Sequence, residues 1–174
     1  GHHRYLHSFP TRRSSDLAGQ VFSALRDEAP IHIDVIGVGA SPYDILNMRR
    51  QQVIGVNVAE SATETDRSGR IRFFNLRSQL WWKMREALEP SANTGIALPP
   101  DPKLRADLCA PTWSMTGTTL KVEGREDIVK RLGRSPDHGS AYILALMNTP
   151  KIGMIEAMGG GARTSAAGDY DPYS

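Results

Sequence analysis

The chain has 174 residues, a formal net charge of +2, 40% hydrophobic residues and 23% charged residues. These values fit one globular domain, and the small net charge neither demands nor excludes a nucleic-acid partner. The single cysteine, Cys109, excludes a disulfide framework and argues against a structural zinc site. No apolar run approaches the roughly 20 residues of a membrane span, and no signal peptide is evident, so we expect a cytoplasmic protein.

The opening stretch differs from the rest of the sequence. Residues 1–17 are basic and rich in Ser, Arg and His, and they lack a clear hydrophobic period. Within them, residues 7–17 (HSFPTRRSSDL) resemble the translation of a sequencing adapter. The alternative is a basic, disordered arm that binds DNA. We expect residues 1–17 to be artefactual or disordered and the domain to begin near Ala18, so Arg12 and Arg13 are not counted as a basic patch.

The next part of the chain predicts an α/β unit. Apolar residues at helical spacing predict an amphipathic helix that Pro30 ends, and two β-branched runs predict buried strands. Ser41 is the expected cap of the helix between the strands. The predicted order is a helix at 18–29, a strand at 31–36, a turn at 37–42, a helix to about 51 and a strand at 53–58. This order implies parallel strands joined by a right-handed crossover.

The second half predicts helices around a hairpin. The predicted helices are 75–88, 103–109, 126–132 and 135–148, and strands at 112–114 and 119–122 flank the turn MTGT. Trp81 and Trp82 are adjacent on a helix, so we expect one in the core and the other at an edge. The Gly- and Ser-rich residues 151–174 are expected to form a flexible tail. The expected domain therefore spans residues 18–150.

Asp34 is the first candidate for chemistry. It lies in an apolar strand just before a glycine turn, where an unpaired carboxylate costs several kcal/mol (on the order of 2–7) unless a partner or a metal compensates it. In open α/β sheets, ligands bind at the carboxyl ends of the strands. The alternative is that Asp34 caps the following turn through backbone N–H groups. Residue type alone leaves both interpretations open. The turn itself, GVGASP, has neither GxGxxG spacing nor a Walker lysine, which argues against a nucleotide site.

Asp137 is the second candidate, near the start of the last predicted helix. Acidic residues are favoured in first turns by the helix dipole, so capping is a sufficient explanation for it. His138 follows and could be a second ligand, a phosphate contact or an exposed residue. A basic run precedes it and could hold DNA phosphates, although interleaved acids also suit a solvated face. The basic residues are Lys121, Arg125, Lys130, Arg131 and Arg134.

Four ordered segments resemble the carboxyl-terminal nuclease domain of phage terminase large subunits. The segments are IDVIGVGASPYDIL at 33–46, VIGVNVAES at 53–61, NLRSQLWWKMREAL at 75–88 and LKVEGREDIVKRLGRSPDHGSAYILAL at 120–146. The resemblance covers residues 18–148. It implies an α/β, incomplete RNase H-like fold with a central sheet of parallel strands flanked by helices, plus a small β-hairpin.

The resemblance also implies a site and an activity. The family cuts concatemeric viral DNA with divalent metal ions held by an Asp on the first strand, an acid on a later strand and an acid at the start of the last helix. Asp34 matches the second acid and Asp137 the third, whereas the first strands and the packaging ATPase domain have no counterpart here. Where the family has a further acid, this chain has Ser140, and Asp44 matches an acid that could support the site.

The implied function follows from these matches. Asp34 and Asp137 would hold Mg²⁺ or Mn²⁺ for phosphodiester hydrolysis, in a two-metal site that is incomplete in this chain. The basic residues of the closing segment would bind DNA, namely Lys121, Arg125, Lys130 and Arg134. Implied partners are double-stranded DNA, a portal protein and a small terminase subunit, in the host cytoplasm and without a membrane. We expect no cleavage by this chain alone. The alternative is a non-catalytic DNA- or partner-binding module of the packaging machinery.

Overall fold

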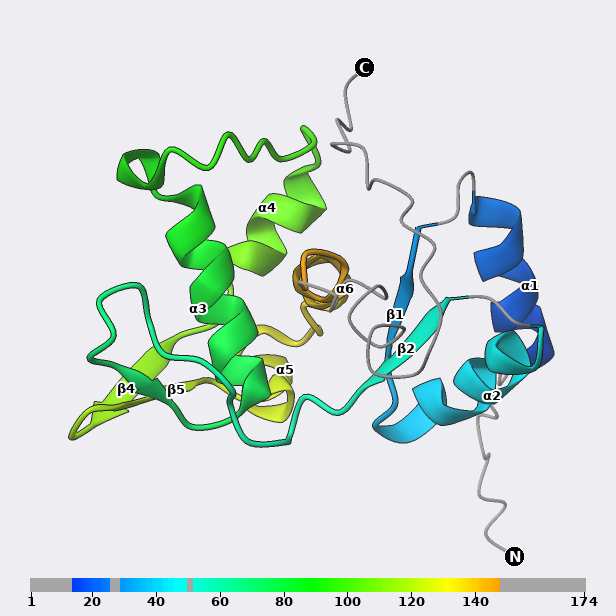
Figure 1. The fold of residues 1–174 in the computed structure, drawn as a ribbon, viewed down its shortest axis with the longest axis horizontal. Coiled ribbons are helices and arrows are strands. Elements are labelled where there is room, and N and C mark those ends of the chain that lie inside the picture. Colours follow the sequence, from blue (N-terminus) through cyan, green and yellow to red (C-terminus); the bar gives the residue numbers. More distant parts are fainter. Residues whose placement is uncertain (1–13, 26–28, 50–51, 148–174) are drawn as a thin grey trace, which may run out of the picture.

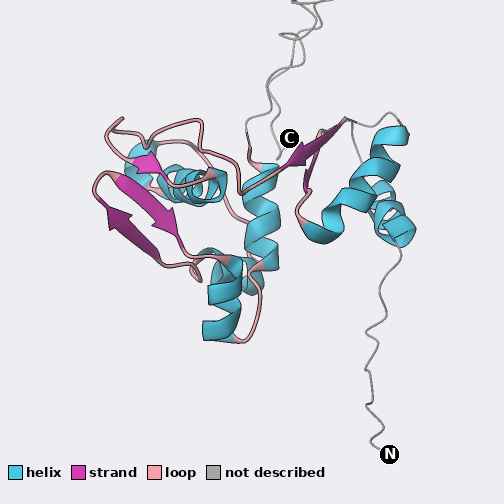
Figure 2. Cartoon of the chain, turned by 90° about the horizontal axis from the view of Figure 1, so that it is seen from below, coloured by secondary structure: helices cyan, strands magenta, loops and turns pink. Residues whose placement is uncertain are grey.

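The structure is a computed structural model that describes residues 14–25, 29–49 and 52–147. The expectations for most of the first 17 residues and for the tail at 151–174 fall outside these described residues. Helices and strands are interspersed along the chain, and two separate sheets are present in the described part, one with two strands and one with three (Figures 1 and 2).

The first sheet forms the predicted α/β unit. Strand β1 (Ile31–Asp34) pairs in parallel with β2 (Val53–Val56), so that Asp34 lies beside Val56. Helix α1 (Ser14–Ala24) packs against α2 (Ala40–Met48), which joins the two strands. The predicted parallel pair with a helical crossover is confirmed.

The first helix and both strands of this unit end earlier than predicted, at Ala24, Asp34 and Val56, and the starts of the two helices also differ. Helix α1 begins at Ser14, ahead of Ala18, with Asp16 in its first turn, where the helix dipole favours an acid. Helix α2 begins at Ala40, with Gly39 as its cap, so Ser41 lies inside the helix and the prediction of a Ser41 cap was wrong. The reason is a short 3₁₀ turn, Gly37–Gly39, which starts the helical winding earlier than the sequence indicated.

The second sheet has the order β3–β5–β4. Strands β4 (Trp113–Thr116) and β5 (Thr119–Val122) form the predicted antiparallel hairpin around Gly117, whose positive φ of 58° suits a tight turn. Strand β3 (Arg72–Phe73) pairs in parallel with β5 and was not predicted. Two residues are too few to show the alternation by which a strand is recognised in a sequence.

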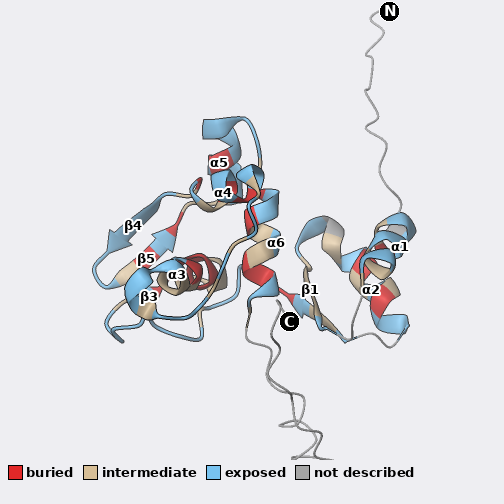
Figure 3. Ribbon diagram, turned by 90° about the horizontal axis from the view of Figure 1, so that it is seen from above, coloured by how far each residue is buried: buried red, intermediate tan, exposed pale blue. Residues whose placement is uncertain are grey.

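The remaining helices cover this sheet and lie between the two sheets. They are α3 (Leu76–Leu88), a 3₁₀ turn (Pro90–Ala92), α4 (Pro102–Leu108), α5 (Arg125–Leu132) and α6 (Asp137–Ala145). Helix α6 contacts β1 on one side and α3 and α4 on the other, and it stands between the sheets in each view (Figures 1 and 3).

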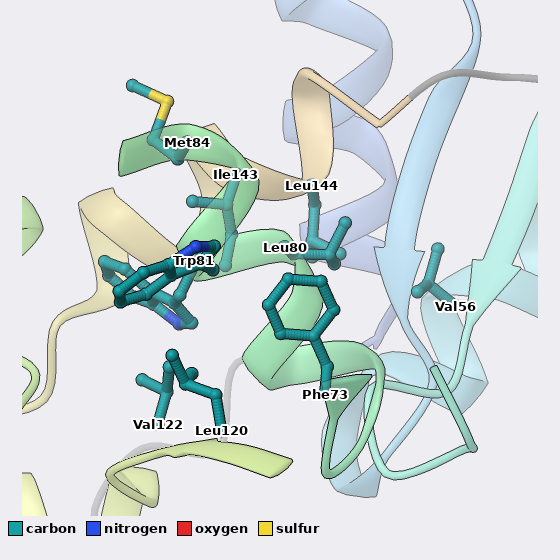
Figure 4. Close-up of a cluster of buried hydrophobic side chains, with 10 residues drawn as sticks. Val56, Phe73, Leu80, Trp81, Met84, Leu120, Val122, Ile143 and Leu144 are labelled. Atoms are coloured by element: carbon teal, nitrogen blue, oxygen red, sulfur yellow. The ribbon is translucent and has the colours of Figure 1, made fainter. Parts of the chain in front are cut away.

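Apolar side chains from α3, α6 and both sheets meet in one core (Figure 4). The core residues include Val56, Phe73, Leu80, Trp81, Met84, Leu120, Val122, Ile143 and Leu144. Both tryptophans are buried, which corrects the expectation that one lies at an edge. The reason is that α3 is covered twice: Trp81 faces α6, and Trp82 meets Trp113 of the hairpin with ring centroids 5.2 Å apart.

No helix within the described residues is long and apolar enough to cross a membrane.

Candidate nucleic-acid and metal site

Asp34 lies at the carboxyl end of β1 and is half-buried. Its Oδ1 accepts a hydrogen bond of 3.0 Å from the backbone N–H of Ile36, so the carboxylate does cap the turn. Gly39 closes the same turn: a Cβ at this position would lie 1.7 Å from the backbone oxygen of Asp34. One carboxylate oxygen is therefore used by the turn, and Oδ2 accepts no hydrogen bond within the described part of the chain.

Arg77 is a cation in the first turn of α3 to which the sequence analysis assigned no role. Its backbone N–H donates to the carbonyl of Val58 at 2.9 Å, just beyond β2, which places it at the edge where Asp34 ends β1. Its Nε donates to the carbonyl of Glu123 at 3.2 Å, and its guanidinium lies 5.6 Å from the Trp81 ring centroid. An arginine in the first turn of a helix is unfavourable for the helix dipole. This position was the one feature of the sequence that could have identified Arg77 as a functional candidate.

Burial and nearby charges shift the pKa of Arg77. Burial lowers the pKa of Arg77, and the carboxylate of Asp34 opposes that effect. The positive charge of Arg125 lowers the pKa of Arg77 further, and the carboxylate of Glu123 raises it. No ion pair within 4.0 Å joins Asp34 to Arg77 among the described residues, and Nη2 of Arg77 is buried without a partner.

Asp137 begins α6 and is exposed. Its Oδ1 accepts from the Ser135 hydroxyl at 2.5 Å and lies 3.5 Å from Nη2 of Arg125. The Nε of Arg125 donates to Ser135 at 2.8 Å, so the three side chains form one network. Asp34 and Asp137 share no hydrogen bond in the described chain; Asp34 acts on Arg77 through its charge alone, and Asp137 forms an ion pair with Arg125.

The other predicted DNA-binding residues have different surroundings. Lys121 is exposed on β5, with its Nζ 4.9 Å from the Phe74 ring centroid, and Lys130 is exposed beside Asp127. Arg134 instead forms an ion pair with the buried carboxylate of Asp107. The exposed cations remain candidates for phosphate contact, whereas Arg134 has a structural partner.

The two possible supporting residues lie elsewhere. Asp44 is exposed on α2 and makes no contact with Asp34 or Asp137 in the part that the structure describes. The Nδ1 of His138 lies 3.9 Å from Asp101, and its backbone N–H donates to Asp107. His138 is thus oriented toward the α4 side and not toward Asp34.

The two aspartates have the ligand chemistry that a hard divalent cation prefers, but they are too few for a site with two metal ions. Carboxylate oxygens such as those of Asp34 and Asp137 are ligands that Mg²⁺ and Mn²⁺ accept. Within residues 14–25, 29–49 and 52–147, however, no three potential ligands come together. An arginine accompanies each of the two carboxylates. The described residues therefore offer a partial site and not the clamp that two metal ions require.

Glu123 fixes the hairpin to α5 beside this site. Its carboxylate accepts from the Thr112 N–H at 3.0 Å and pairs with Arg131 at 2.5 Å. The Arg131 hydrogen bond and the Thr112 N–H lower the pKa of Glu123 from 4.5 to about 2. Because the pKa of Glu123 is lower in the folded state, its carboxylate stabilises the fold fully above the unfolded-state pKa. This stabilisation is lost as the pH falls through the folded-state pKa.

We therefore expect Glu123→Gln to lower the melting temperature near neutral pH. The difference from wild type should shrink as the pH falls from about 4.5 to 2, because protonation removes the same interaction from the wild type. Thermal melts across this range measure it. Glu89→Gln, at an exposed position, is the control and should melt like the wild type. A Glu123→Gln difference that does not vary with pH would contradict this account.

The described residues form an α/β fold with two parallel strands, a helical crossover, a mixed three-stranded sheet and a last helix between the sheets, and this fold matches RNase H-like nuclease domains. Solved structures that match this fold include nuclease domains of the large terminase subunit gp2 of bacterial virus Sf6. A point mutant of that domain, with manganese and beta-thujaplicinol, matches with a TM-score of 0.61 and 18% identity over 78% of this chain and 73% of that chain.

Two further structures of the Sf6 domain give the same result. The mutant with manganese alone matches with a TM-score of 0.60 over 78% of this chain and 74% of that chain, and a third structure of the domain also reaches 0.60. No protein-family model and no curated protein sequence matches the chain. At 18% identity, the likeness establishes the fold, and the expected RNase H-like architecture is confirmed.

Proposed function

We propose that the chain is part of the nuclease region of a phage DNA-packaging terminase, a metal-dependent endonuclease that cuts concatemeric DNA in the host cytoplasm. The observation that carries the proposal is the match to the Sf6 terminase nuclease domain over 78% of the chain, together with the position of Asp34. An acid at the carboxyl end of a parallel strand lies where α/β sheets bind their ligands. A portal protein and a small terminase subunit are the proposed protein partners.

The proposed roles follow the geometry of the site. Asp34 and Asp137 would contribute oxygen ligands to Mg²⁺ or Mn²⁺, consistent with the manganese in two of the matching structures. When bound, such ions activate a water molecule and stabilise the leaving oxygen in phosphodiester hydrolysis. Exposed Lys121, Arg125 and Lys130 would contact the DNA backbone without reading sequence. Arg134 would act indirectly, by holding Asp107.

Cation binding tests the role of Asp34. Millimolar MnCl₂ should raise the melting temperature of the wild type by a small amount, because a ligand that binds only the folded state stabilises it. Asp34→Asn should abolish the rise. Asp127→Asn, which removes an exposed carboxylate from α5, should retain it. A melting temperature independent of Mn²⁺ would overturn the metal role and favour a non-catalytic binding module.

Nicking of supercoiled plasmid tests activity. Because the described residues supply too few ligands for two metal ions, we expect this chain to bind duplex DNA but not to cleave it in Mn²⁺. Gel electrophoresis of the plasmid after incubation gives the answer. Robust cleavage that Asp34→Ala abolishes would show that the site is complete, contrary to this expectation.

A further inference from the structure

Arg77 carries a positive charge that the described protein does not neutralise by direct pairing. Its Nε is used by the carbonyl of Glu123, which is uncharged, and its Nη2 is buried without a hydrogen-bond partner. A buried polar donor without a partner costs about 1–3 kcal/mol, and more when it is charged. Native structures keep such groups mostly at sites where a ligand or water supplies the missing interaction.

A second cation stands in the same neighbourhood. The positive charge of Arg125 acts unfavourably on Arg77, and both arginines are anchored around Glu123: Arg77 by its carbonyl, Arg125 by lying two residues beyond it. The Arg125 side chain is 63% exposed, whereas Arg77 is half-buried. Two like charges brought together at one edge of a sheet are relieved by an anion and made worse by a cation.

Asp34 does not fully neutralise the positive charge of Arg77. It lies close enough to raise the pKa of Arg77, but no ion pair within 4.0 Å joins the two side chains in the described chain. The second acid, Asp137, is exposed and interacts with Arg125 at 3.5 Å, a distance at which solvent weakens the attraction. The charges at this edge therefore sum to zero, because three acids (Asp34, Asp137 and Glu123) face three arginines (Arg77, Arg125 and Arg131), and they leave a metal ion little net attraction.

We propose that Arg77 is the fixed positive charge of a phosphate-binding position beside Asp34, where exposed Arg125 makes the contact with the DNA backbone. This deepens the proposed function and depends on it. Arg77 acts as a positioning residue: it favours an anionic phosphodiester at this edge and, through the same charge, weakens the binding of a bare cation to Asp34. Neutralising Arg77 should therefore change the two affinities in opposite directions.

The experiment compares Arg77→Gln with Arg77→Lys and with a matched control. Arg85→Gln removes the same charge from the same helix, two turns away, where the guanidinium lies 4.4 Å from the Trp82 ring centroid. For each protein, fluorescence anisotropy measures affinity for a labelled DNA duplex at several salt concentrations. Thermal melts in MnCl₂ measure cation affinity, and melts without Mn²⁺ confirm that each variant is folded.

Arg77→Gln should weaken duplex binding about tenfold, most clearly at low salt where charge effects are least screened, while Mn²⁺ binding becomes several-fold tighter. Arg77→Lys keeps the charge and should retain both wild-type affinities, and Arg85→Gln should change neither. Loss of both affinities in both Arg77 variants, or no change relative to Arg85→Gln, overturns the proposal and identifies a purely structural arginine. If the wild type binds neither duplex nor Mn²⁺, the proposed function itself fails.

Discussion

Asp107→Ala is expected to destabilise the protein by about 3 kcal/mol, because it breaks a buried network of charged hydrogen bonds. Asp107 is only 1% exposed, and its Oδ2 accepts from the N–H groups of His138 and Gly139 at 2.9 and 3.3 Å. Its Oδ1 pairs with Arg134. The alanine variant would leave two helix-terminal N–H groups and one cation without their partner, at the first turn of α6.

Urea denaturation at neutral pH measures this loss. Asp101→Ala is the matched control, because Asp101 also caps a helix, through the Lys103 N–H at 2.8 Å, but is far less buried. It should cost about 1 kcal/mol, the usual effect of removing a cap. If the two variants lose the same stability, the buried carboxylate has no role beyond capping.

Acid should weaken the same contact. Burial raises the pKa of Asp107, but the Arg134 ion pair and the N–H groups of α6 outweigh burial and lower it overall. A carboxyl group with a lowered pKa stabilises the fold above its unfolded-state pKa and loses that contribution as the pH falls through its folded-state value. The loss of unfolding free energy in Asp107→Ala should therefore be greatest near neutral pH.

Gly39→Ala should be nearly as damaging, for a steric reason. The new Cβ would lie 1.7 Å from the Asp34 carbonyl oxygen and 3.2 Å from Cγ2 of Ile33. Backbone cannot rotate away as a side chain does, so β1 or α2 must move, at a cost of about 3 kcal/mol, the upper end for overpacking. The displaced turn should also abolish the Mn²⁺-dependent rise in melting temperature.

Gly19→Ala provides the control for this substitution. Gly19 lies in α1 with no atom within 4 Å of an added Cβ, so alanine should stabilise the helix by up to about 1 kcal/mol. Melting temperatures of the two variants should therefore move in opposite directions. A Gly39→Ala protein with wild-type stability and an unchanged Mn²⁺ response would show that the turn tolerates a side chain.

The sequence predicted those elements whose signal is local. The β-branched runs of β1 and β2 and the glycine turn between β4 and β5 carry their own periods and turn residues, and both pairings were found. Strand β3 is defined only by its partner β5 and was missed. The burial of Trp82 depends on Trp113, 31 positions away in the chain, and no helical period can reveal it.

The site was less predictable, because charge partners are a property of the folded chain. Asp34 was identified from its apolar strand, and the structure shows that it caps the turn. Arg134 was grouped with the exposed cations, but its partner Asp107 lies in a short helix that looks polar in the sequence. Arg77 was overlooked because nothing local distinguishes a half-buried arginine from a solvated one. Such assignments require contacts between residues 27 to 46 positions apart.

Helix α6 separates two sheets that share no strand pairing in the described chain. The position of one sheet relative to the other therefore depends on this nine-residue helix (Asp137–Ala145), whose first turn is hydrogen-bonded to Asp107. Gly139 allows α6 to approach Trp81 closely, because a Cβ at position 139 would lie 2.9 Å from the Trp81 ring. The position of Asp34 relative to the arginines therefore depends on packing around α6 at Asp107 and Gly139, which are not among the proposed ligands.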